Sequence, residues 1–195
     1  APDDREVRPM ATDELARSFA STRGVLANVT RDQFGESTPC RSWTVGALVN
    51  HIVGAPRFAV AAIETGVAAG ADDDYTTGNF LAQYDETSTA TIGAFGMPGA
   101  LEKTVTLPFG DIPVPFLLMM VATDQFTHGW DLARATGQST DLDADLAAGF
   151  LAQARASVSD QFRGDDGVAP FGPEQRAPAG SCAADQLAAF LGRSV

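Results

Sequence analysis

Apolar residues recur at intervals of three and four along most of the chain, which is the spacing of helices with one buried face. The pattern predicts helices over about residues 12–28, 44–66, 80–95, 116–136, 141–162 and 182–191. Thr44 suits the N-cap of the second helix, and Pro56 is expected to kink that helix after His51. Pro115 suits the first turn of the fourth helix, and Gly137 suits its end.

One short stretch departs from the helical period. Residues 103–107 alternate between polar and apolar positions and include β-branched side chains, which predicts a strand. The turn formers that follow, Pro108 and Gly110, predict a small hairpin at one end of the bundle. Residues 66–79 are expected to form an exposed loop, and residues 164–180, rich in Gly and Pro, an irregular segment. We therefore expect residues 1–195 to form one mainly α domain, an antiparallel four-helix bundle with extra C-terminal helices and a small β element.

Composition narrows the classes of partner. The 195 residues are 45% hydrophobic, enough for one sizeable core, and carry a net charge of −12. An acidic chain without a basic stripe is not expected to bind nucleic acid or anionic membranes. The longest apolar run, around residues 116–122, is too short for a membrane span, and the polar N-terminus has no signal-peptide core. We expect a cytoplasmic protein that acts on a small molecule, with homodimer formation left open.

The chain has only two histidines, and both fall in predicted helices. Asp124 and His128 are four residues apart, so they project from the same helix face one turn from each other. His51 lies in another helix among apolar neighbours. Two imidazoles and one carboxylate are a common ligand set for zinc, nickel, cobalt or iron. The sequence thus predicts a divalent-metal site made by His51, Asp124 and His128.

A structural interpretation competes with this one. A histidine within a helix more often packs than binds a metal, and an acid four residues before a histidine is a common surface ion pair. Against it, Asp124 follows the apolar run 116–122, where an uncompensated carboxylate would be costly. Asp131, three residues after His128, could accept an imidazole N–H, act as an alternative ligand, or pair with Arg134.

Other candidate residues carry weaker signals. Arg57 could orient a substrate carboxylate, although a surface salt bridge is the more common role of such an arginine. Cys40 could be a ligand or reactive thiol, although a small buried side chain is more common, and a disulfide between Cys40 and Cys182 stays open. Nucleotide-binding and serine-hydrolase motifs such as GxGxxG, Walker A and GxSxG are absent from the sequence.

Residues 38–54 (TPCRSWTVGALVNHIVG), residues 124–138 (DQFTHGWDLARATGQ) and the closing residues 190–193 (FLGR) resemble a known group. They are similar to actinobacterial metal-binding proteins of the DinB-like superfamily, which are related to the metal-binding domain of mycothiol-dependent maleylpyruvate isomerase. The resemblance implies a four-helix bundle that holds a divalent metal, commonly zinc, on His51, Asp124 and His128. Asp124 replaces the longer glutamate of the isomerase.

The resemblance implies mycothiol or a similar thiol as cosubstrate. It makes a metal-dependent thiol S-transferase or thiol-assisted isomerase the leading hypothesis, with zinc as the first choice of metal and nickel or iron as alternatives. The isomerase has a second domain for which this chain has no room, so maleylpyruvate isomerisation itself is not expected. A non-haem iron enzyme or metal-hydroxide hydrolase would use the same ligands. A non-enzymatic binding or stress-related module with a structural or absent metal is the main alternative.

Overall fold

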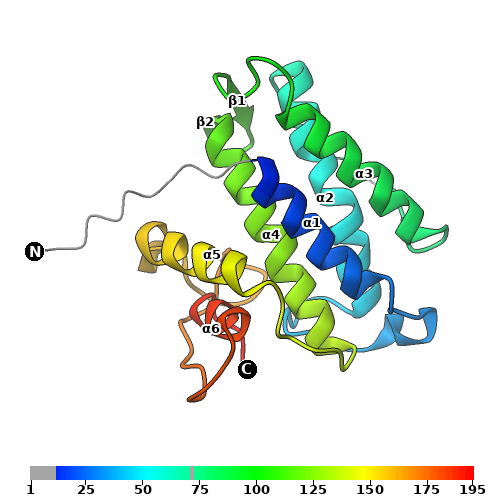
Figure 1. Cartoon of the computed structure of the whole chain (residues 1–195), viewed down its shortest axis with the longest axis vertical. Coiled ribbons are helices and arrows are strands. Elements are labelled where there is room, and N and C mark those ends of the chain that lie inside the picture. The colour runs from blue at the N-terminus through cyan, green and yellow to red at the C-terminus, as the bar shows by residue number, and fades with distance from the viewer. Residues whose placement is uncertain (1–11, 71–72) are drawn as a thin grey trace, which may run out of the picture.

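Four long helices lie side by side, and two shorter ones pack next to the lower part of α4 in Figure 1. The structure, a computed structural model, describes residues 12–70 and 73–195, so the polar N-terminal residues and part of the loop 66–79 lie outside the described residues. The elements are α1 (Thr12–Leu26), α2 (Val45–Thr65), α3 (Phe80–Phe95), β1 (Thr104–Leu107), β2 (Gly110–Pro113), α4 (Val114–Ala135), α5 (Ala144–Ser157) and α6 (Ala183–Phe190). Short 3-10 turns cover Arg31–Gly35 and Asp160–Phe162.

The bundle consists of two pairs of helices. Helices α1 and α4 run in one direction, and α2 and α3 run in the opposite direction. The hairpin β1–β2 lies at one end, where α2 and α3 finish and α4 begins (Figure 1). Ser18 and Thr22 of α1 donate hydrogen bonds to the carbonyls of Ala122 and Gln125, so α1 and α4 run in the same direction. Helices α2 and α3 both end beside the hairpin, so they also run in the same direction (Figure 1).

The sequence predicted most element boundaries within a few residues. Thr44 caps α2 by accepting a hydrogen bond from the Ala47 N–H, and Gly66 ends the helix with φ 85°. The fifth helix was predicted too long, because Val158 and Phe162 continue the helical spacing after α5 has ended at Ser157. The mainly helical fold with a small hairpin is confirmed.

The C-terminal segment 164–180 has neither helix nor long strand, as predicted, yet it is held in place. The Arg163 guanidinium donates to the carbonyls of Gly172 and Phe190. Gly172 also packs directly against Gly192, where a Cβ would lie 2.5 Å from the Gly172 Cα. These contacts hold the segment against the end of α6, and its residues form one wall of the site described below.

A buried polar network joins the four bundle helices. The Tyr84 hydroxyl of α3 lies 3.0 Å from Gln125 Oε1 of α4 and 3.2 Å from the Phe19 carbonyl of α1. The Gln125 amide donates to the carbonyl of Ile52 in α2. Because burial disfavours the phenolate, the pKa of Tyr84 is raised far above its usual value. Satisfied buried groups of this kind fix the relative positions of the helices.

Gly129 allows α1 and α4 to approach each other closely. A Cβ at this position would lie 2.5 Å from Thr22 Oγ1 and 3.3 Å from Thr22 Cα, and Thr22 is fully buried. We expect Gly129→Ala to lower the free energy of unfolding by about 1–3 kcal/mol through overpacking. Chemical denaturation measures this loss. Gly149→Ala is the matched control, because a Cβ at Gly149 of α5 meets nothing within 4 Å; it should be neutral or slightly stabilising.

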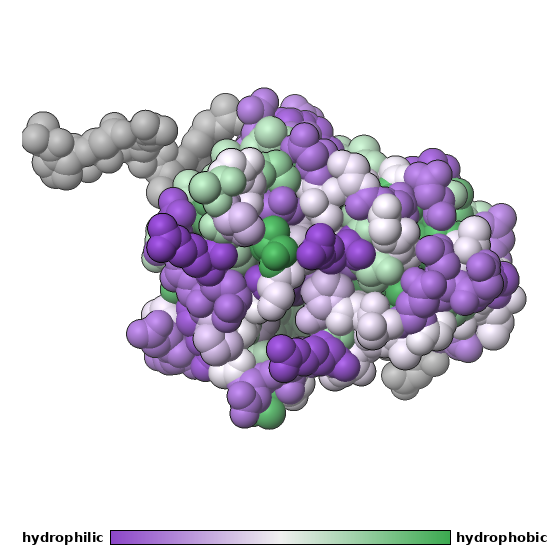
Figure 2. Space-filling model, turned by 90° about the horizontal axis from the view of Figure 1, so that it is seen from below, coloured by the Kyte–Doolittle hydropathy of each residue, from purple (hydrophilic) through white to green (hydrophobic). Residues whose placement is uncertain are grey.

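One expectation about membrane spans needs correction. Helix α2, Val45–Thr65, is long and apolar enough to cross a membrane by length and composition, although its sequence contains small residues and a proline rather than one apolar run. Half of that window is buried within the bundle. The face seen from below in Figure 2 is mostly hydrophilic, with small separate hydrophobic patches.

Candidate metal centre

The side chains of His51, Asp124 and His128 meet between α2 and α4. Asp124 and His128 lie one turn apart on α4, and the antiparallel packing of α2 brings His51 opposite them. Asp124 Oδ2 is 3.3 Å from His51 Nε2, and Asp124 Oδ1 is 3.3 Å from His128 Nε2. The two imidazole rings are 4.8 Å apart and nearly perpendicular. Residues from distant parts of the chain therefore place three donor atoms around one point.

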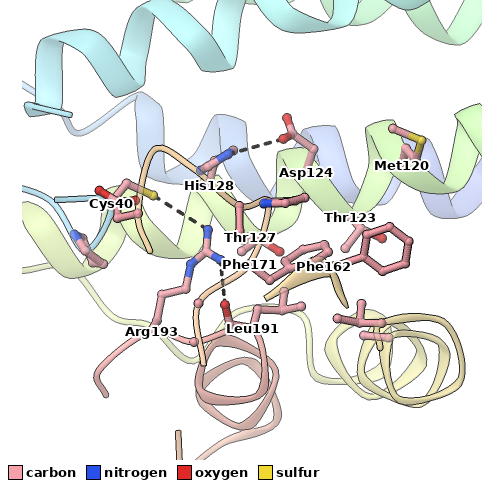
Figure 3. Close-up of a pocket in the computed structure, with 18 of the residues that line it drawn as sticks. Cys40, Met120, Thr123, Asp124, Thr127, His128, Phe162, Phe171, Leu191 and Arg193 are labelled. Carbon is pink, nitrogen blue, oxygen red and sulfur yellow. Dashed lines mark hydrogen bonds and ion pairs between the residues drawn. The ribbon is translucent and has the colours of Figure 1, made fainter. Parts of the chain in front are cut away.

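Three further residues hold His128 in place. Its Nδ1 lies 3.0 Å from Oδ2 of the fully buried Asp131, which directs Nε2 toward Asp124. The Arg193 guanidinium binds Asp131 at 3.0 and 3.2 Å, and the Cys40 thiol donates to Asp131 at 3.3 Å. Figure 3 shows Arg193 and Cys40 on the same side of His128. Of the roles that its spacing allowed, Asp131 makes the contact with the imidazole nitrogen, and its ion-pair partner is Arg193 and not Arg134.

Trp43 covers the two imidazoles. Its ring lies 4.6 Å from that of His51 and 5.3 Å from that of His128, between centroids. Trp43 is half-buried at the site. Its indole limits the rotation of both histidines, and this keeps their ring nitrogens directed toward Asp124.

The protonation of Asp124 and that of His128 each depend on the charge of the other group. Burial favours the neutral form of each group, but the charges of the two imidazoles outweigh it and lower the pKa of Asp124 far below its usual value. Burial likewise opposes protonation of His128, yet the Asp124 carboxylate raises the pKa of that imidazole well above its usual value. For Asp131, the Arg193 charge overcomes burial and lowers the pKa to about 2. Both carboxylates are therefore ionised at neutral pH, and Asp124 is the one that is not paired with an arginine.

The spacing of the donor atoms fits one divalent cation. Two ligands about 2.1 Å from a tetrahedral zinc ion are roughly 3.4 Å apart. The Asp124 oxygens are 3.3 Å from each histidine Nε2, and all three donor atoms lie within 4.8 Å of one another. The Asp124 side chain is 37% exposed, so the position beside it is open to a further ligand. Such an open site is typical of catalytic rather than structural metals.

A second group of potential ligands, Cys40, His128 and Asp131, shares His128 with the first. Here Asp131 is already neutralised by the Arg193 guanidinium, and Cys40 donates its thiol hydrogen to the same carboxylate. A histidine that binds a metal through one nitrogen commonly donates the other N–H to a carboxylate. We therefore interpret Asp131 and Cys40 as support for the His51–Asp124–His128 triad. Both Cys40 and Cys182 are free thiols in the structure.

Arg57 points to a different part of the molecule. Its Nε donates to Thr87 Oγ1 of α3, and its guanidinium lies 5.2 Å from the centre of the Tyr75 ring. It does not line the cavity next to the triad. Substrate orientation by Arg57 remains a prediction that these contacts do not support.

The triad opens onto a large cavity of about 2040 Å³. Helices α2 and α4 form one side, and α5 with the segment 162–173 and the residues after α6 form the other. Arg193 lines it next to Cys40 and His128 (Figure 3). Arg193 lies in the closing FLGR motif, 62 residues after Asp131, and nothing in its local sequence pattern indicates that it returns to the site.

Metal binding should release a proton from His128. The imidazole of the metal-free protein is protonated at pH 7 because its pKa is raised, but a metal ligand must be neutral at the binding nitrogen. Affinity should therefore rise with pH, by about tenfold per unit, until the pH exceeds the pKa of His128. Calorimetric zinc titrations in two buffers of different ionisation enthalpy give the number of protons released. A count near zero at pH 7 would contradict the coupling between Asp124 and His128.

Comparison with known proteins agrees with the fold and with the sequence resemblance. Two proteins of Mycobacterium tuberculosis, MT0763 and Rv0738, are each 42% identical to the chain over 190 residues, which is 95% of this chain and 97% of theirs. The crystal structure of the mycothiol-dependent maleylpyruvate isomerase is similar with a TM-score of 0.54 and 17% identity, a likeness of fold. The match covers 65% of this chain and only 62% of the isomerase. Residues 15–133 match the family described as the mycothiol maleylpyruvate isomerase N-terminal domain, and the chain belongs to that family.

Proposed function

We propose that the protein holds a divalent cation, with zinc as first choice and nickel or iron as alternatives, on His51, Asp124 and His128. In this proposal it acts as a thiol S-transferase or thiol-assisted isomerase, with mycothiol or a similar low-molecular-weight thiol as cosubstrate and a small electrophile as substrate. The observation that carries it is the spacing of the three donor atoms beside an open cavity. Membership of a family named after a mycothiol-dependent enzyme supports the choice of thiol.

The chain's own residues prepare this site. Asp131 accepts the Nδ1 hydrogen of His128 and so presents the other ring nitrogen to a cation. Arg193 balances the charge of Asp131, and Trp43 limits rotation of both imidazoles. When bound, a divalent cation lowers the pKa of a coordinated thiol and so supplies a thiolate at neutral pH. In the transferase reaction the thiol gives its proton to a base in solution, its sulfur forms a bond to the electrophilic carbon, and the leaving group departs from that carbon with the electron pair of the broken bond.

Thiol binding can be tested on cobalt-substituted protein. Mycothiol added to the Co²⁺-loaded chain should produce a saturable sulfur-to-metal charge-transfer band in the near ultraviolet. The Cys40→Ser variant is the background for this titration, because the Cys40 thiol lies beside the site and could produce such a band itself. A loaded Cys40→Ser protein that shows no band at any mycothiol concentration would refute the thiol proposal.

The size of the cavity favours a second candidate, a non-enzymatic small-molecule-binding module in which the metal is structural or absent. Asp124→Ala separates the two candidates. For an enzyme, this variant should lose thiol-dependent turnover. For a binding module, it should change thermal stability and leave any thiol chemistry unaltered.

A further inference from the structure

The cavity beside the triad has an apolar part that metal and thiol binding do not require. Seven large hydrophobic side chains are exposed in the described residues, and four of them line this one cavity. These four are Phe109, Phe116, Phe162 and Val168, exposed by 66, 43, 42 and 86%. Exposed apolar side chains scattered singly need no explanation, but a group around one cavity indicates a binding surface.

Met119 and Met120 of α4 extend the same wall, and Met120 lies one turn before Asp124. Methionine adapts its shape to irregular apolar partners. In Figure 3, Phe162 and Phe171 lie between α4 and the C-terminal helices, across from the triad. The apolar wall is therefore continuous with the proposed metal site.

Thr127 marks a polar position in the same cavity. Its hydroxyl is the single buried side-chain N or O atom without a hydrogen-bond partner in residues 12–70 and 73–195, and the residue is only 5% exposed. It directly precedes His128, lines the cavity, and lies between the triad and Phe171 in Figure 3. A buried hydroxyl without a partner is unfavourable, and a polar ligand atom would satisfy it.

The charged side chains that line the cavity do not favour a small substrate with two negative charges. Its lining contains three arginines and three aspartates, and one of the arginines, Arg193, is already paired with buried Asp131. Apolar contacts, and not net positive charge, therefore distinguish the ligands that fit.

We propose that the site takes a small electrophile with a polar head and an alkyl or aryl body. The head lies at the triad and accepts or donates a hydrogen bond at Thr127, and the body lies along Phe116, Met120 and Phe162. This inference rests on the proposed metal-dependent function and specifies its substrate class.

The test uses n-alkyl hydroxamic acids from acetyl to octanoyl as probes, because a hydroxamate combines a metal-binding head with a variable apolar tail. Calorimetry measures their affinity for the metal-loaded and the chelator-treated protein. Affinity should rise about two- to fourfold for each added methylene, up to the value for full burial. A wild-type affinity that does not change with chain length would overturn the inference.

Two variants locate the tail. Met120→Ala and Phe162→Ala should weaken octanoyl hydroxamate binding by at least about fivefold while changing acetohydroxamate little. Met97→Ala is the matched control, since Met97 is 44% exposed and lies outside the cavity. Equal effects of the Met97 and Met120 variants would contradict the assigned tail position.

Thr127→Val gives a readout that a purely structural role would not produce. Removing an unpaired buried hydroxyl should leave or raise thermal stability, yet hydroxamate affinity should fall about two- to tenfold, and Thr127→Ser should retain it. Unchanged affinity in Thr127→Val would remove the polar contact from the proposal. If metal-loaded and chelated proteins bind equally while the chain-length dependence persists, the metal proposal fails and the apolar site stands.

Discussion

Asp131→Ala is expected to destabilise the metal-free protein by about 3–5 kcal/mol. Asp131 is fully buried, and its carboxylate receives the Arg193 guanidinium, the His128 imidazole and the Cys40 thiol. Without it, the Arg193 charge, on a side chain that is 12% exposed, would have no counter-ion. Urea unfolding of chelator-treated protein measures the loss.

A double variant serves as the control. Asp131→Ala combined with Arg193→Met removes both charges, so it should recover part of the stability that the single substitution loses. Asp131→Ala should also weaken zinc binding by about 10–100-fold, because His128 loses the acceptor that orients it. A stability loss below about 1 kcal/mol would show that Asp131 does not hold the buried cluster together.

His128→Ala is expected to reduce zinc affinity by more than about 100-fold, beyond the loss caused by removing a supporting carboxylate. The imidazole supplies one of three donor atoms, and its Nε2 is 3.3 Å from Asp124. His51→Ala should have a similar effect, since His51 is 3.3 Å from the other oxygen of the same carboxylate. Competition with a chromophoric chelator measures the zinc affinity of each variant.

Asp165→Ala is the matched control for these substitutions, because Asp165 is an exposed carboxylate that lines the same cavity and belongs to neither group of potential metal ligands. Its zinc affinity should equal that of the wild type. If His128→Ala retained wild-type affinity while Asp165→Ala lost it, the metal would have to bind elsewhere in the cavity.

Periodicity was sufficient to predict the bundle. The apolar spacing identified the six α-helices found in the described part of the chain. Turn formers such as Gly66 and Gly137 marked helix ends correctly, because both residues adopt positive φ there. The pairing of helix directions was not predicted, since it depends on how the loop 66–79 returns along the bundle. Such a path is determined by tertiary contacts rather than by local residue preferences.

The close approach of His51, Asp124 and His128 was predictable, because two of the three are one helical turn apart. The support around it was not, because Trp43 and Arg193 reach it from distant parts of the chain. Residues 164–180 were predicted to form an irregular segment. That this segment forms a wall of the cavity is seen only in the folded structure. Its Gly and Pro content indicates the lack of a helix but contains no information about what it packs against.

The measurement that tests the central claim most directly is the metal content of untagged wild-type protein purified without chelator and again after reconstitution with zinc. With His51, Asp124 and His128 spaced for one cation, we predict about one equivalent of divalent metal per chain. A wild-type protein that retains no metal after reconstitution would contradict the account, and would leave Asp124 as a carboxylate paired only with two imidazoles.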